Sequence, residues 1–315
     1  MTFGFGFLSK LSKQKADASA NSSLTTSVTT HDGTASAVTA KPLNKTTKWK
    51  LNDGTLMPIV GLGTWQAEGK DVERAVFEAL RAGYRHIDTA RIYSNEEQVG
   101  IGVKRAIAEL GIPRSDIFVT TKLWNSDHGN VAEAFSESLA RLGLDYVDLY
   151  LMHFPVKDRL GSWKALEKIK KSGKAKSIGV SNFTIRHLQE LLPSCSIVPS
   201  VNQVELTPLL YQKELIDFCQ AKNILVQAYS PLLRGQHLTD AVFAKIAAAH
   251  HKTVPQILLR WCLQHGLVPL PKSVTPARIE ANIELFDFEL TAEQMKILDG
   301  LNKNLRLCWD PTSAP

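Results

Sequence analysis

A regular alternation of short apolar runs with longer amphipathic segments is the feature that most constrains the fold. Eight apolar runs are short enough to be strands, and segments with helical periodicity follow most of them. Many of these helical segments end in Gly or Asn, the usual signal that stops a helix. The apolar runs are Pro58–Gly63, Arg85–Asp88, Ile117–Lys122, Val147–His153, Ala175–Val180, Val201–Glu205, Leu225–Tyr229 and Leu267–Leu270.

Eight strand–helix units predict an α/β fold in which the strands close into a (β/α)8, or TIM, barrel. The competing architecture is a doubly wound open sheet, which needs a glycine-rich phosphate turn after its first strand. The first strand leads instead into GLGTW at 61–65, which is not G-x-G-x-x-G, and no other stretch supplies that pattern. Before it, KWKLNDGTLMP has an Asp53-Gly54 turn signal and predicts an N-terminal β-hairpin.

The first part of the chain has a different composition. Half of residues 21–40 are Ser or Thr, and the stretch has no apolar periodicity. Such a segment cannot bury enough surface to offset its ordering entropy. We therefore predict that residues 1–46 form a disordered, basic, Ser/Thr-rich extension and that residues 47–315 form the barrel domain. The extension contains no arginine, so a passive tail on a cytoplasmic protein is favoured over organelle targeting.

The net charge of +6 is concentrated in residues 1–50, which contain seven lysines and two aspartates. The rest of the chain is nearly neutral, which argues against a nucleic-acid-binding surface. No apolar run approaches the ~18 residues that a membrane span needs, so no membrane association is expected. The four cysteines have neither C-x-x-C nor zinc-ligand spacing, so we predict reduced thiols and no metal site.

Polar side chains end nearly every apolar run. The carboxyl ends of barrel strands converge on one face, where catalytic groups lie. Each residue alone has a structural explanation, such as a helix cap or a packed ring, but their convergence favours a site. The residues are Asp88, Tyr93, Lys122, His153, Ser181, Asn182, Gln203, Glu205, Tyr229, Ser230 and Lys272.

A carboxylate, a phenol, a lysine and a histidine at one site have a clear chemical use. A buried ammonium paired with a carboxylate favours the phenolate, so we expect Lys122 to lower the pKa of Tyr93. The phenol can then donate a proton to an oxygen on which negative charge develops. The histidine can hold that oxygen with a second hydrogen bond.

Four motifs, over residues 49–309, resemble the aldo-keto reductases: GYRHIDTARIYSNEEQVG, RLGLDYVDLYLMHFP, IGVSNF and LVPLPKSVTPARIEAN. The resemblance implies a monomeric (β/α)8 enzyme that reduces aldehydes and ketones to alcohols with hydride from NADPH. It also implies a catalytic tetrad of Asp88, Tyr93, Lys122 and His153. Tyr93 would donate the proton and His153 would orient the carbonyl of the substrate.

The resemblance extends to residues that would hold NADPH and the substrate. Ten residues match the family's contacts with NADPH, in order from the nicotinamide through the pyrophosphate to the adenosine. They are Ser181, Asn182, Gln203, Tyr229, Ser230, Leu232, Lys272, Ser273, Arg278 and Asn282. Tyr229 would stack on the nicotinamide ring, while Lys272 and Arg278 would bind the 2′-phosphate. The aromatic residues that would form the walls of the substrate pocket are Trp65, Trp124, Phe154 and Trp309.

The helix expected after the last strand supports a preference for NADPH over NADH. Thr275 is a good N-cap and Pro276 is favoured at the first helical position, so free backbone N–H groups would face a phosphate there. Two departures from the family pattern stand out. Phe154 replaces a tryptophan, and Ala281 occupies the place of a glutamate. Glu280 is one position off and would point about 100° away on a helix.

Two other functions remain open from the sequence. One is an NADPH-binding regulatory or redox-sensing protein on the same barrel, although such a protein has no need of a complete tetrad. The other is a phosphate-ester isomerase or lyase, for which no carboxylate pair or metal cluster is present at the strand ends. The segment between Phe154 and the helix at Ser162 is short, and so is the tail after Asn302. Short segments at these two places predict an open substrate pocket. The sequence does not name the physiological carbonyl compound.

Overall fold

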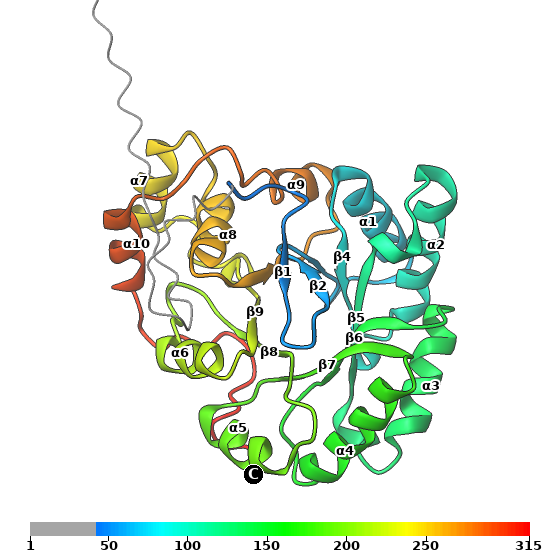
Figure 1. The fold of residues 1–315 in the computed structure, drawn as a ribbon. Coiled ribbons are helices and arrows are strands. Elements are labelled where there is room, and N and C mark those ends of the chain that lie inside the picture. The colour runs from blue at the N-terminus through cyan, green and yellow to red at the C-terminus, as the bar shows by residue number, and fades with distance from the viewer. Residues whose placement is uncertain (1–41) are drawn as a thin grey trace, which may run out of the picture. The chain divides into compact units, whose positions relative to one another are not determined.

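The computed structural model describes residues 42–315, and eight of its strands form one parallel barrel (Figure 1). The strands pair with their neighbours in chain order. The barrel closes where the Gly61 N–H donates to the Pro269 carbonyl at 3.1 Å and Gly63 bridges Lys272. The predicted closed barrel is therefore confirmed. Its strands are β3 (Leu62–Gly63), β4 (His86–Asp88), β5 (Phe118–Leu123), β6 (Val147–Met152), β7 (Ala175–Ser181), β8 (Val201–Glu205), β9 (Leu225–Tyr229) and β10 (Val268–Leu270).

Helices surround the strands because each presents one apolar face to the sheet. Several helices end at a glycine with positive φ, such as Gly83 after α1 and Gly143 after α3, as their sequences predict. The segments that form α7, α8 and α10 were not predicted to be helical from the sequence. The helices are α1 (Gly69–Ala82), α2 (Glu96–Leu110), α3 (Val131–Leu142), α4 (Arg159–Lys171), α5 (Ile185–Leu191), α6 (Lys213–Ala221), α7 (Ala241–Ala249), α8 (Val254–Gln264), α9 (Pro276–Ala281) and α10 (Ala292–Asp299).

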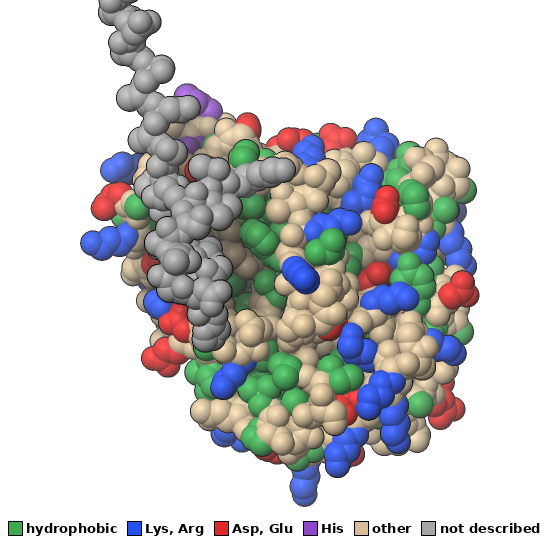
Figure 2. Space-filling model, in the orientation of Figure 1, with side chains coloured by type: hydrophobic (Ala, Val, Ile, Leu, Met, Phe, Trp, Pro, Cys, Tyr) green, Lys and Arg blue, Asp and Glu red, His purple; other side chains and the backbone are tan. Residues whose placement is uncertain are grey.

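The predicted hairpin, β1 (Lys48–Lys50) and β2 (Leu56–Pro58), covers the amino end of the barrel (Figure 1). Met57 on β2 is fully buried in an apolar cluster with strand residues such as Phe118 and Val268. This end is thus filled by side chains. The face in Figure 2 mixes Lys and Arg with Asp and Glu side chains. Among residues 42–315, no helix is both long and apolar enough to cross a bilayer.

The predicted extension, residues 1–46, lies outside the described residues apart from 42–46, of which Leu43 and Lys45 contact the barrel. Leu43 packs against the core. The Asn44 side chain accepts a hydrogen bond from the Thr46 N–H at 2.8 Å. Lys45 pairs with Glu284, next to α9 and far along the chain. Contacts with the barrel are therefore already present at residues 43 and 45, within the predicted extension.

A comparison of two shortened chains tests this contact. A chain that begins at Lys48 should melt about 2–4 °C below one that begins at Leu43, because partial burial of one leucine and one exposed ion pair together contribute roughly 1–2 kcal/mol. Differential scanning calorimetry measures the two midpoints. Equal midpoints would show that residues 43–47 add nothing to the stability of the barrel.

Candidate active site

A cavity of about 820 Å³ opens at the carboxyl end of the strands. Most residues predicted for the site line it. They are Trp65, Asp88, Tyr93, His153, Asn182, Gln203, Tyr229, Ser230, Leu232, Lys272, Ser273, Arg278, Asn282 and Trp309. Five predicted residues are not part of this lining: Lys122, Ser181, Glu205, Trp124 and Phe154.

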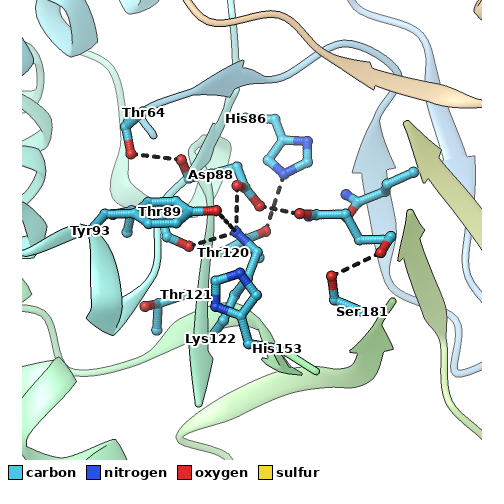
Figure 3. Close-up of polar contacts among 12 residues, drawn as sticks. Thr64, His86, Asp88, Thr89, Tyr93, Thr120, Thr121, Lys122, His153 and Ser181 are labelled. Atoms are coloured by element: carbon cyan, nitrogen blue, oxygen red, sulfur yellow. Dashed lines mark hydrogen bonds and ion pairs between the residues drawn. The ribbon is translucent and has the colours of Figure 1, made fainter. Parts of the chain in front are cut away.

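The ammonium of Lys122 lies between a carboxylate and a phenol (Figure 3). It donates hydrogen bonds to Asp88 Oδ1 at 2.6 Å, the Thr89 carbonyl at 2.9 Å and the Tyr93 hydroxyl at 3.2 Å. Lys122 and Asp88 come from adjacent strands, β5 and β4, whereas Tyr93 ends the short 3₁₀ helix Arg91–Tyr93. The three groups are therefore brought together as the sequence predicts.

A second set of bonds fixes Asp88. The Gln203 side-chain amide donates to Asp88 Oδ2 at 2.8 Å and to Gln227 Oε1 at 2.9 Å. Both carboxylate oxygens of Asp88 are thus engaged, and the charged carboxylate is satisfied although it is buried. The ion pair cannot rotate away from the phenol without breaking these bonds.

The prediction for the pKa of Tyr93 is wrong for this structure. Burial raises the pKa of its hydroxyl well above the ordinary value, and the nearby Asp88 carboxylate raises it further. Burial likewise lowers the pKa of Lys122, although Asp88 opposes that change. The Asp88 carboxylate largely balances the charge of Lys122. The removal of the Tyr93 hydroxyl from water therefore has the larger effect on its pKa.

His153 follows β6 and faces Tyr93 across the cavity. The two ring centroids are 5.7 Å apart. Burial, and then the Lys122 charge, lower the pKa of His153 well below its ordinary value, so the imidazole is neutral at neutral pH. Its Nδ1 atom is buried and has no hydrogen-bond partner among residues 42–315. A neutral imidazole can give one hydrogen bond and accept another.

Asn182 holds the backbone beside His153. It has φ of +63°, a conformation that costs energy for a non-glycine residue, and its side-chain amide donates to the His153 carbonyl at 2.9 Å. The Tyr229 hydroxyl donates to Asn182 Oδ1 at 2.8 Å, which fixes the ring that faces the cavity. Ser181 is buried beside Asn182, and its hydroxyl donates to the Gln203 carbonyl at 2.8 Å.

Aromatic rings enclose the part of the cavity next to His153. Trp309 is central, with centroids 6.4 Å from Trp65, 5.7 Å from Trp124 and 6.4 Å from Phe154. Trp124 packs edge-on against His153 at 5.3 Å. The four predicted wall residues therefore form one cluster, of which Trp65 and Trp309 line the cavity.

The far end of the cavity carries Lys272 and Arg278, both exposed. Neither is within ion-pair distance of a carboxylate among residues 42–315. The predicted side-chain cap by Thr275 is absent. The Ser273 hydroxyl accepts a hydrogen bond from the Thr275 N–H at 3.1 Å. Pro276 does begin α9 as predicted.

Beside this end, Glu280 turns away from the cavity. It accepts a hydrogen bond from Arg81 on α1, while Ala281 lines the cavity. Glu280 therefore points away from the cavity, as the 100° rotation per helical residue predicts.

Two residues at the cavity were not predicted from the sequence to belong to the site. Arg234, in the loop after β9, lies over the Trp65 ring at 5.0 Å. Cys308 also lines the cavity, with its Sγ atom 3.4 Å from Ser230 Oγ. A single arginine or cysteine in an irregular segment belongs to no pattern, so the sequence offers no signal for either. Among residues 42–315, no group of three potential metal ligands is present.

Comparisons with known proteins agree with this geometry. The family model described as "Aldo/keto reductase family" matches residues 59–303. Glyoxal reductase of Bacillus subtilis is 50% identical over 266 residues, covering 83% of this chain and 95% of that protein. Methylglyoxal reductase DkgA of Yersinia pestis is 46% identical over 267 residues, covering 83% and 95% respectively.

A solved structure agrees as well. The aldo-keto reductase of Bombyx mori, crystallised in complex with NADP, is 42% identical to the chain with a TM-score of 0.80, covering 85% of this chain and 97% of that one. The chain therefore belongs to the aldo/keto reductase family.

Proposed function

We propose that this protein reduces aldehydes and ketones to alcohols with NADPH, and that Tyr93 donates the proton. One observation carries the proposal most directly: the Lys122 ammonium contacts both Asp88 and the Tyr93 hydroxyl at the base of the cavity. A protein that only senses a cofactor has no use for a buried charge pair against a phenol. The names of the reductases that resemble the chain support the same reaction.

The residues present fit NADPH. The cavity runs from His153 to two cations, Lys272 and Arg278, that lack carboxylate partners among the described residues. Asn182 and Gln203 would hold the carboxamide and Tyr229 would stack on the nicotinamide. Ser230 and Leu232 would cover the pyrophosphate, and Lys272, Ser273, Arg278 and Asn282 would hold the adenosine 2′-phosphate end. When bound, NADPH supplies the hydride for the carbonyl carbon.

Side chains of this protein would then bind the carbonyl oxygen of the substrate and supply its proton. The neutral His153 can give that oxygen a hydrogen bond and so orient it. Tyr93, whose raised pKa keeps it protonated, gives its proton as negative charge develops there. The phenolate left behind is stabilised by the Lys122 ammonium, 3.2 Å away. Lys122 thus acts after the proton has moved rather than by lowering the resting pKa.

The reaction is tested by following the absorbance of NADPH with a panel of small aldehydes, ketones and dicarbonyls. We expect oxidation of NADPH with several of them. If the protein binds NADPH but oxidises none with any carbonyl of the panel, the regulatory or sensing alternative takes its place. If it does not bind NADPH at all, both assignments fail.

For the chain as a whole, we infer a monomeric cytoplasmic enzyme in which residues 47–315 form the catalytic domain and 1–46 an extension. The thiols of Cys195, Cys219, Cys262 and Cys308 are free, as expected in a reducing compartment. The family resemblance supports the monomer. Light scattering of the purified protein tests the monomer, and two chains per particle would contradict it.

The pH dependence of the reaction follows from the shifted pKa values. His153 gains a proton only well below pH 6.5, and Tyr93 loses its proton only above its ordinary pKa of about 10. Reduction needs the neutral imidazole and the protonated phenol. We therefore expect kcat/KM to be flat between about pH 6 and pH 8 and to fall only outside this range. A transition centred near pH 6.5 would contradict a buried, neutral His153.

A further inference from the structure

Asn95 lies two residues after Tyr93 in the chain and is only 2% exposed. Its side-chain amide donates hydrogen bonds to the Thr64 carbonyl at 2.9 Å and to the Ala67 carbonyl at 3.1 Å. Its Oδ1 atom accepts a hydrogen bond from the Thr89 hydroxyl at 2.7 Å. Both N–H groups of the amide are therefore used, and the side chain joins the loop after β3 to the loop after β4.

The segment that carries Tyr93 is short and contains only one turn of helix. The turn Arg91–Tyr93 is closed by a hydrogen bond from the Tyr93 N–H to the Ala90 carbonyl at 3.0 Å. Ser94 follows with φ of +55°. Asn95 then precedes the first residue of α2, where an asparagine commonly caps the helix with its side chain, but it makes no such cap here. Helix capping therefore does not explain why an asparagine occupies this position.

The residues that Asn95 contacts also hold the tetrad (Figure 3). The Thr89 carbonyl accepts a hydrogen bond from the Lys122 ammonium at 2.9 Å. The Thr64 hydroxyl donates to the Asp88 carbonyl, also at 2.9 Å. Asn95 is thus bonded to one residue that holds Lys122 and to another that holds the backbone of Asp88. The Asn95 amide connects both of these contacts to the segment that carries the phenol.

The alignment of the Tyr93 hydroxyl tolerates little movement. Its distance from the Lys122 ammonium, 3.2 Å, is at the long end of the range for a hydrogen bond. A displacement of about 1 Å at a reacting group can lower a rate on the order of 100-fold. Loss of the Asn95 amide would free the loop only two residues from Tyr93.

We propose that Asn95 is a positioning residue for proton transfer, because its amide holds Tyr93 where the phenol can protonate the substrate. The inference rests on the proposed function and adds to it a residue outside the tetrad. Asn95 does not line the cavity, so it acts through Tyr93 rather than on the substrate or the cofactor. A buried and fully bonded amide also stabilises the fold, and the experiment must separate the two effects.

Asn95→Ala removes the three hydrogen bonds and leaves Tyr93 in place. With NADPH bound, the single-turnover rate of reduction of 4-nitrobenzaldehyde should fall on the order of 10- to 100-fold, because the proton donor is no longer aligned. The dissociation constant of NADPH, measured by quenching of tryptophan fluorescence, should change by less than about twofold, because Asn95 lies outside the cavity.

Gln264, at the end of α8, provides a matched control. Its side chain also makes three hydrogen bonds: it donates to the Leu290 carbonyl at 2.9 Å and accepts from the Leu290 N–H at 2.7 Å and from Arg260 at 3.1 Å. It does not line the cavity. Gln264→Ala should lose stability in a similar way and leave the single-turnover rate nearly unchanged. An equal fall of the rate in both alanine variants would overturn the proposal, because general loosening would then explain it.

A double-mutant cycle with Tyr93→Phe tests whether Asn95 acts through the phenol. Where the hydroxyl is already absent, Asn95→Ala should lower the single-turnover rate by less than about twofold. The same fold-loss with and without the hydroxyl would overturn the proposal. If circular dichroism shows that Asn95→Ala does not fold, Thr89→Val takes its place in the cycle, because it removes only the hydroxyl that donates to Asn95. Its smaller loss of rate should likewise disappear in the Tyr93→Phe background.

These outcomes differ from a failure of the proposed function. If the wild type oxidises no NADPH with 4-nitrobenzaldehyde or any other carbonyl compound, the proposed function fails and the role of Asn95 fails with it. If the wild type is active and the fold-losses in the two backgrounds are equal, only the role of Asn95 is overturned.

Discussion

Tyr93→Phe should lower kcat for aldehyde reduction by about 10²–10⁴, the contribution of a positioned general acid. The substitution removes only the hydroxyl, which lies 3.2 Å from the Lys122 ammonium, and keeps the ring against His153. Because no cofactor contact is assigned to this hydroxyl, the dissociation constant of NADPH should stay the same. Steady-state kinetics and a fluorescence titration measure the two quantities separately.

Tyr150 is the matched control for this substitution. It is a fully buried tyrosine on β6 whose hydroxyl has no hydrogen-bond partner among residues 42–315. Its ring packs against Phe135 of α3, away from the cavity. Tyr150→Phe should therefore leave kcat nearly unchanged. If Tyr93→Phe also kept near-normal turnover, Tyr93 would not be the proton donor.

The second large effect concerns the choice between NADPH and NADH. Lys272 and Arg278 have no carboxylate partner among residues 42–315, so their charges are available to a 2′-phosphate. Each hydrogen bond to a charged group contributes roughly 1.5–3 kcal/mol, and exposure favours the lower value. Two contacts then give about 3 kcal/mol, on the order of 100-fold tighter binding of NADPH than of NADH.

Arg278→Ala should remove about tenfold of this preference, and the double substitution with Lys272→Ala most of it. NADH affinity should hardly change, because NADH has no 2′-phosphate. Arg105 on α2 is a partly exposed arginine that pairs with Glu109 and does not line the cavity, so Arg105→Ala should leave both affinities unchanged. Added salt should weaken NADPH binding more than NADH binding. Equal dissociation constants of the two cofactors in the wild type would show that the assignment is wrong.

The strands and the residues at their ends could be predicted because the signals are local. A run such as Val147–Met152 is apolar apart from Asp148, as expected of a strand buried on both faces, and it ends at the carboxyl face of the barrel. Once the barrel is accepted, topology alone brings Asp88, Lys122 and His153 together. The segments with helical periodicity between the runs were likewise predictable, and helices do follow most of the strands.

What the sequence could not provide depends on contacts between distant segments. Glu205 was recognisable as a strand-end residue, but its partners lie at Leu307 and Cys308, about a hundred residues later. The pKa of Tyr93 depends on how burial competes with a balanced ion pair, which residue types alone do not determine. Thr275 shows the same limit at short range, because its residue type and its position before Pro276 favour a side-chain cap that the structure does not contain.

The closure of the barrel has a consequence for how the chain acquires its activity during synthesis. Seven pairings join strands that are neighbours in the chain, but the eighth joins β3, ending at Gly63, to Lys272. This contact spans some two hundred residues and carries the largest loop-closure entropy of the sheet. A nascent chain can therefore pair β3 through β9 as they leave the ribosome, yet it has no complete cofactor groove until residue 272 arrives. Because Lys272 stands at this last joint, closing the barrel also brings the first of the two cations proposed for the 2′-phosphate to the cavity.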